Sequence, residues 1–188
     1  IPAEDAPPAP QAHAPVQPEQ PAAARRRPAL SPRESHASAD LRARLVTNAP
    51  NAVSLEQYRR LAAVLHDVQI HKHLKTVMIT SAVPQEGKTL TLVNLALTLS
   101  ESYAGRVLGI DADLRWPSLH SLLGVPNHRG LSEALCRGQQ DHPIVDVSSR
   151  LAVVTAGRPG RTPVAGLASE RMAEVIDECA ARYDWVLI

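Results

Sequence analysis

From about residue 54 onward, apolar positions recur first with a helical period and then in short runs separated by polar loops. The first stretch has the three-and-four spacing of an amphipathic helix, and Ser54 with Gln57 forms the capping box expected at a helix start. Its predicted apolar face consists of Leu55, Tyr58, Leu61, Leu65 and Val68. Further on we predict strand 76–80, helix 88–104, strand 106–110, short helices near 118–123 and 131–137, strand 151–155, helix 166–182 and strand 184–188.

This alternation of strands and helices is typical of an α/β domain, in which a parallel β-sheet carries helices on both faces. The helix predicted over residues 88–104 is apolar nearly all round, as expected for a helix packed between the sheet and its neighbours. Residues 51–188 supply enough chain for one such domain.

The first fifty residues differ in composition from the rest. They hold ten of the chain's 16 prolines and no glycine. They are rich in Pro, Ala and Gln and therefore offer too little apolar surface to offset the entropy lost when a chain becomes ordered. We predict a disordered Pro/Ala-rich arm over residues 1–50. Within it, Arg25, Arg26 and Arg27 form a basic cluster that we interpret as part of a solvated linker, the alternative being contact with anionic lipid or an acidic partner.

The charge balance and the hydropathy restrict the partners further. A net charge of +1 argues against broad nucleic-acid binding, so we predict no nucleic-acid partner. The chain has no apolar run of 18 residues, and its N-terminus does not resemble a signal peptide. We therefore expect a cytoplasmic domain whose association with a membrane comes through a partner.

The clearest chemical signal follows the first predicted strand. Gly87-Lys88-Thr89 comes after an apolar strand and a short polar loop and opens a long helix. Backbone N–H groups at a helix N-terminus can solvate a nucleotide's phosphates, Lys88 would neutralise them, and the Thr89 hydroxyl would hold Mg²⁺. Ala82 stands where the consensus has its first glycine, so the alternative is a glycine turn that opens a helix. We predict nucleotide contacts from Ser81, Pro84, Gln85, Glu86, Gly87, Lys88, Thr89 and Leu90.

Two aspartates, Asp111 and Asp113, follow the next predicted strand. Carboxylates two residues apart share one side of the chain, and this end of an open α/β sheet faces the ligand crevice. One carboxylate can reach a hydrated metal while the other accepts a proton. The alternative is a solvated Asx turn that caps the following helix.

These segments together resemble the bacterial tyrosine kinases of the P-loop class, cytoplasmic kinases associated with capsule and exopolysaccharide export. Residues 80–89 resemble their Walker A segment, and residues 107–119 resemble the additional aspartate motif called Walker A′. Three other segments resemble further parts of the family's sequence: residues 56–61, 167–172 and 183–188. All five segments occur in the same order along the chain as in the family.

The resemblance implies a P-loop NTPase fold and an ATP- and Mg²⁺-dependent protein tyrosine kinase that regulates exopolysaccharide or capsule biosynthesis and export. Lys88 would stabilise the transferred phosphoryl group. Asp111 would be the base facing the tyrosine hydroxyl, and Asp113 with Thr89 would hold the metal, although the two aspartates can exchange roles. The implied partners are ATP, a tyrosine-rich tail of this chain or of a partner, a membrane polysaccharide co-polymerase or adaptor, and further copies of the chain in a homo-oligomer.

Two substitutions depart from the family's pattern. Gln85 replaces the usual loop glycine, so we expect the loop to bend without a positive φ or by another route. Glu56 and Arg59 match the family's Glu-x-x-Arg-x-x-Arg helix, which resembles a ring-forming contact, but its last arginine is Ala62 here.

The chain ends at Ile188, where the family's Walker B aspartate would be the next residue. We therefore expect residues 1–188 alone to be weakly active and to expose apolar surface on Val186.

Two other functions stay open at this point. An ATPase switch of the chromosome-partitioning or septum-positioning type also uses a modified Walker A. Sequences that resemble that class carry a second lysine early in the loop, where this chain has Ser81 and Ala82. The absence of that lysine favours the kinase. A non-catalytic regulatory partner that binds nucleotide weakly or not at all is the third hypothesis, suggested by Gln85, Ala62 and the missing Walker B residue.

Overall fold

The computed structural model describes residues 43, 45, 52–136, 143–158 and 163–188. The predicted arm, with its cluster Arg25, Arg26 and Arg27, lies outside these residues except for Ala43 and Leu45, so its disorder stays a prediction. Leu45 is 7% exposed and belongs to one of the two hydrophobic clusters of the domain.

Helices and strands alternate along the described chain much as predicted. Their bounds are α2 (Ala52–Lys72), β1 (Thr76–Val77), α3 (Lys88–Ser102), β2 (Val107–Ile110), α4 (Leu119–Leu123), α5 (Leu131–Ala134), β3 (Ile144–Asp146), β4 (Leu151–Val154), α6 (Pro163–Leu167), α7 (Glu170–Arg182) and β5 (Trp185–Leu187).

Two local predictions are wrong, and one strand was missed. Helix α2 is already formed at Ala52, so Ser54 lies within its first turn and is not its N-cap. Strand β3 was not predicted, because three residues at a sheet edge give too short an alternation to detect. The helix predicted over residues 166–182 is divided into α6 and α7 at Ser169, whose hydroxyl donates a hydrogen bond to the Gly166 carbonyl at 2.6 Å.

The described strands form one five-stranded sheet in the order β1-β5-β2-β4-β3. All neighbouring pairs are parallel except β3 and β4, which are antiparallel. Strand β5 lies between β1 and β2, and Val186 at its centre is 0% exposed. The expectation that Val186 would be exposed is therefore wrong, since β1 and β2 flank its strand and its side chain packs in a hydrophobic cluster with residues of α7.

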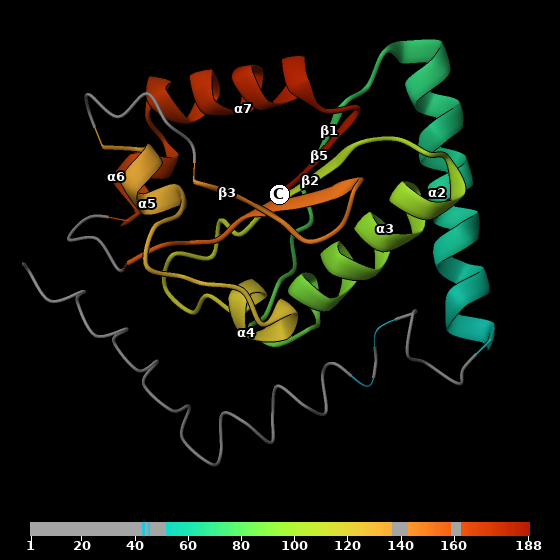
Figure 1. Ribbon diagram of the computed structural model, residues 1–188, viewed down its shortest axis with the longest axis horizontal. Helices are drawn as coiled ribbons and strands as arrows, with labels where there is room; N and C mark the ends of the chain where they lie inside the picture. The colour runs from blue at the N-terminus through green and yellow to red at the C-terminus, as the bar shows by residue number, and fades with distance from the viewer. Residues whose placement is uncertain (1–42, 44, 46–51, 137–142, 159–162) are drawn as a thin grey trace, which may run out of the picture. The chain divides into compact units, whose positions relative to one another are not determined.

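Side chains of the sheet alternate between two hydrophobic clusters on opposite faces. Val107 and Trp185 pack with α3 in one cluster, and Leu108 and Val186 pack with α7 in the other. Figure 1 shows α7 on one side of the strands and α3 on the other. The predicted α/β architecture, with helices on both faces of a mostly parallel sheet, is thus confirmed.

Helix α3 lies close to the sheet because β2 contains Gly109. A Cβ atom at this position would stand 3.0 Å from Leu92 Cδ2 and 3.5 Å from Val153 Cγ1. On α2, Ala62 is 0% exposed and packs in the α3 cluster, whereas Leu61 is 41% exposed. Leu61 therefore does not belong to the buried face predicted for this helix, and an arginine in place of Ala62 would put a charge into the core.

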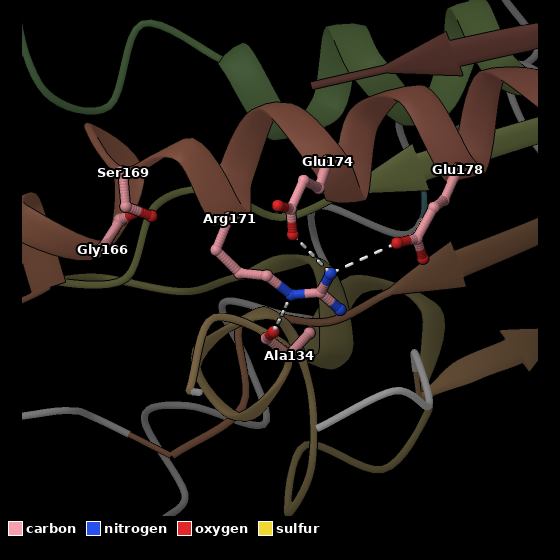
Figure 2. Close-up of polar contacts among 6 residues, drawn as sticks. All are labelled: Ala134, Gly166, Ser169, Arg171, Glu174 and Glu178. Atoms are coloured by element: carbon pink, nitrogen blue, oxygen red, sulfur yellow. Dashed lines mark hydrogen bonds and ion pairs between the residues drawn. The ribbon is translucent and has the colours of Figure 1, made fainter. Parts of the chain in front are cut away.

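Arg171 attaches α7 to α5 (Figure 2). Its Nε donates a hydrogen bond to the Ala134 carbonyl at 3.3 Å, and its Nη1 donates to Glu174 at 2.9 Å and to Glu178 at 3.2 Å. The Arg171 side chain is only 20% exposed. These bonds fix α7 against α5, the short helix that ends at Ala134.

Candidate nucleotide and metal site

The loop that joins β1 to α3, residues 78–87, is here called the phosphate loop. Gly87 is the N-cap of α3, with φ 94°, and no side chain among the described residues caps this helix end. A Cβ atom on Gly87 would meet no described atom within 4 Å, so the positive φ rather than lack of space favours glycine here. The first N–H groups of α3 have no intrahelical partner and lie at the positive end of the helix dipole, which suits an anion.

Gln85 also has a left-handed backbone, with φ 66°. Of the two possibilities expected at this residue, a bend without a positive φ is not found, and Gln85 itself takes the positive φ. Gln85 takes a conformation that glycine adopts freely and that costs an L-residue about 1–2 kcal/mol. Pro84, Gln85 and Glu86 are all exposed, and Glu86 Oε2 accepts a hydrogen bond from the Val83 N–H at 3.4 Å.

The Lys88 side chain turns back over the phosphate loop. Its Nζ donates a hydrogen bond to Ser81 Oγ at 3.2 Å, and Ser81 Oγ donates to the Val83 carbonyl at 2.9 Å. The ammonium group therefore lies over the loop whose backbone leads into the N-terminus of α3. This is where it would meet a bound phosphate.

Asp111 directly follows β2 and is 6% exposed. Its carboxylate accepts three backbone hydrogen bonds, from Asp113 to Oδ1 at 3.2 Å and from Ser118 and Leu119 to Oδ2 at 3.2 and 3.0 Å. Burial raises the pKa of Asp111 to about 6, although the three hydrogen bonds oppose this shift. Asp111 thus holds the first turn of α4 against the end of β2.

Asp113 is half-buried and forms an Asx-type turn. Its Oδ1 accepts hydrogen bonds from the N–H groups of Arg115 at 3.3 Å and Trp116 at 3.0 Å. The turn that we considered as the alternative is therefore present, and Asp113 nevertheless lines the same cavity as Lys88.

Ser118 was not predicted as a site residue. Its Oγ donates a hydrogen bond to Thr89 Oγ1 at 2.8 Å. It lies within the segment that resembles Walker A′, but a serine at the start of a helix is ordinarily interpreted as a cap, so no separate signal in the sequence marks it.

A cavity of about 280 Å³ brings the predicted catalytic and metal residues together at the C-terminal edge of the sheet. Its polar lining includes Lys88, Thr89, Asp111 and Asp113, and its other walls are mainly apolar. The volume lies near the lower limit of ligand pockets, which suits phosphates and a metal better than a whole nucleotide. The predicted contacts that do not line the cavity are Ser81, Pro84, Gln85, Glu86, Gly87 and Leu90.

The donor set fits a magnesium nucleotide. A threonine hydroxyl and carboxylates are oxygen ligands of the kind that Mg²⁺ prefers, usually together with several waters. Lys88 and the N-terminus of α3 supply positive charge for the phosphates.

The chain matches no protein-family model. It is 36% identical over 140 residues to the tyrosine-protein kinase YwqD of Bacillus subtilis, covering 73% of this chain and 59% of YwqD. It is 30% identical over 151 residues to the succinoglycan biosynthesis transport protein ExoP of Rhizobium meliloti, covering 77% of this chain and 19% of ExoP. The solved kinase domain of the Escherichia coli tyrosine kinase ETK superimposes with a TM-score of 0.69 at 32% identity, covering 78% of this chain and 57% of that one.

The chain belongs to the bacterial P-loop tyrosine kinase family. The tyrosine kinases among these relatives favour the kinase interpretation over a chromosome-partitioning ATPase. The chain spans about three fifths of YwqD and about one fifth of ExoP. Within the described residues of this family member, no helix is both long enough and apolar enough to cross a membrane.

Proposed function

We propose that this chain is the nucleotide-binding part of an ATP-dependent protein tyrosine kinase. The observation that carries the proposal is that Lys88, Thr89, Asp111 and Asp113 line one cavity although they come from two separate segments. A simple glycine turn before α3 would not require two carboxyl groups from the end of β2 at the same place.

The proposed roles follow from the contacts of each residue. The N-terminus of α3 binds the phosphates and Lys88 stabilises charge on the transferred group. Mg²⁺, when bound to Thr89 and Asp113, would neutralise the phosphate oxygens. Asp111 is the proposed base because three hydrogen bonds fix its carboxylate and leave about one of its roughly four lone pairs for the tyrosine proton.

The test is to incubate the purified chain with Mg²⁺-ATP and a tyrosine-containing polypeptide, and to measure phosphotyrosine and free phosphate separately. We expect phosphotyrosine, even at a low rate, and its loss in Asp111→Asn with nucleotide binding retained. The variant Asp113→Asn should instead weaken the Mg²⁺ dependence of binding, and the reverse pattern would exchange the two roles. Free phosphate without phosphotyrosine would favour an ATPase switch, and no nucleotide binding would favour a non-catalytic partner.

We also propose a cytoplasmic role in exopolysaccharide or capsule biosynthesis, with membrane contact through a polysaccharide co-polymerase or adaptor. The similarity to ExoP, a succinoglycan biosynthesis transport protein, supports this proposal. The corresponding measurement is whether the chain co-purifies with such a membrane protein from detergent extracts of its own cells. Failure to co-purify would contradict the proposed partner.

A further inference from the structure

Ser118 connects the two halves of the site. Its Oγ donates a hydrogen bond to Thr89 Oγ1 at 2.8 Å, and its backbone N–H donates to Asp111 Oδ2 at 3.2 Å. Thr89 belongs to α3 and Asp111 follows β2, so a single residue bonds both to the proposed metal-binding hydroxyl and to the buried carboxylate.

The Ser118 hydroxyl is used in an uncommon way. Ser118 is the N-cap of α4, where a serine hydroxyl ordinarily accepts a hydrogen bond from its own helix. No such side-chain cap bond joins Ser118 to the described residues of α4. The Asp111 carboxylate instead accepts the N–H groups of Ser118 and Leu119, so the hydroxyl is left to contact Thr89.

We propose that Ser118 is a positioning residue that orients the Thr89 hydroxyl for Mg²⁺, an inference that rests on the proposed function. A hydroxyl has one hydrogen and two lone pairs. When a lone pair of Thr89 Oγ1 is given to a metal, its hydrogen needs an acceptor, and Ser118 Oγ already lies at hydrogen-bond distance. The bond then reverses: Ser118 donates without the metal and accepts with it.

The surroundings keep Ser118 in place for this role. Leu119, the next residue, is 1% exposed and packs in the hydrophobic cluster that contains α3. Pro117 directly precedes Ser118 and restricts the backbone of the turn that leads from Asp113 into α4. A hydroxyl fixed on both sides needs little reorganisation when the metal binds.

The test is an Mg²⁺ titration of the binding of a fluorescent ADP analogue to the purified chain. Ser118→Ala removes the hydroxyl and keeps the backbone bond to Asp111, and Ser118→Thr restores a hydroxyl. We expect Ser118→Ala to raise the half-saturating Mg²⁺ concentration about tenfold, the usual size of an effect behind a metal ligand. Binding in EDTA should match the wild type, the melting temperature should fall by only the few degrees that one lost hydrogen bond explains, and Ser118→Thr should recover most of the Mg²⁺ dependence.

Thr89→Ala is the reference variant that separates this inference from the proposed function. If Thr89→Ala weakens the Mg²⁺ dependence but Ser118→Ala does not, the positioning role is wrong and the proposed site stands. If neither variant changes it, the metal assignment itself is wrong. A Ser118→Thr variant that behaves like Ser118→Ala, or a Ser118→Ala variant equally weakened in EDTA, would also overturn the positioning role.

Discussion

Gln85 and Gly87, two residues apart in the phosphate loop, both have left-handed backbones, with φ of 66° and 94°. Only one of them is a glycine. The loop therefore keeps the bend that glycines would give it, but holds one L-residue in a conformation that costs about 1–2 kcal/mol. Backbone strain of this kind is concentrated at binding loops, where the surrounding contacts fix the conformation.

Gln85→Gly should stabilise the domain, because it removes this strain. The gain is expected to be about 0.5–1 kcal/mol, since part of it is offset by the greater freedom of glycine in the unfolded chain. Gly87→Ala is the matched control and should destabilise by about 1–2 kcal/mol. Urea denaturation of the three proteins measures both effects, and an unchanged midpoint for Gln85→Gly would show that Gln85 is not strained.

Lys88→Ala should lower the affinity for ATP at least tenfold, because the ammonium group acts on phosphates in a partly desolvated site. Isothermal calorimetry measures the affinity directly. Lys75→Ala is a suitable control, since the Lys75 Nζ donates to the carbonyl of Ala180 in α7 and Lys75 does not line the cavity. Equal affinity of the wild type and Lys88→Ala would rule out the phosphate-loop assignment.

The sequence predicted those parts of the fold that depend on local apolar runs. Strands β2, β4 and β5 are buried along their whole length and appeared as continuous apolar segments. The end of α3 was predicted less well. The helix was predicted to run to residue 104, but Tyr103 is its C-cap and Ala104 already has a positive φ of 53°. The Tyr103 ring lies 4.1 Å, between ring centroids, from the ring of His66 on α2, a tertiary contact that the local sequence does not indicate.

The placement of the candidate site residues was predicted where it depends on strand ends and not where it depends on helix packing. Lys88 and Asp111 were expected at one edge because parallel strands end there together. The Ser118–Thr89 contact joins residues 29 positions apart through the packing of α4, and no local pattern indicates such a hydroxyl pair.

Arg171→Ala should destabilise the domain by about 1–2 kcal/mol, because it removes the bond to the Ala134 carbonyl and two bonds to glutamates from a side chain that is largely buried. Arg60→Ala is the matched control. Arg60 forms an exposed ion pair with Glu56 at 3.3 Å within α2, and such pairs contribute only about 0.3–0.5 kcal/mol. Equal losses in the two variants, measured by urea denaturation, would contradict a special role for the α5–α7 contact.

The buried Asp111 carboxyl should make the stability of the domain depend on pH in a defined direction. Its pKa is about 6 in the folded protein, against 3.8 for the free group. Between about pH 4 and 6 the folded state therefore holds a proton that the unfolded chain has released. More protons bound in the folded state mean that the free energy of unfolding falls as pH rises through this window and levels off above it.

Asp111→Asn isolates this effect, because asparagine does not titrate. We expect the wild type to lose up to about 3 kcal/mol relative to the variant between pH 4 and pH 7, which corresponds to a shift of about two pKa units. The measurement is urea denaturation of both proteins at several pH values in EDTA, so that neither metal nor nucleotide contributes. A difference in unfolding free energy that stays constant from pH 4 to 7 would mean that Asp111 titrates normally, and a difference that grows in the wild type's favour as pH rises would mean that its hydrogen bonds outweigh its burial.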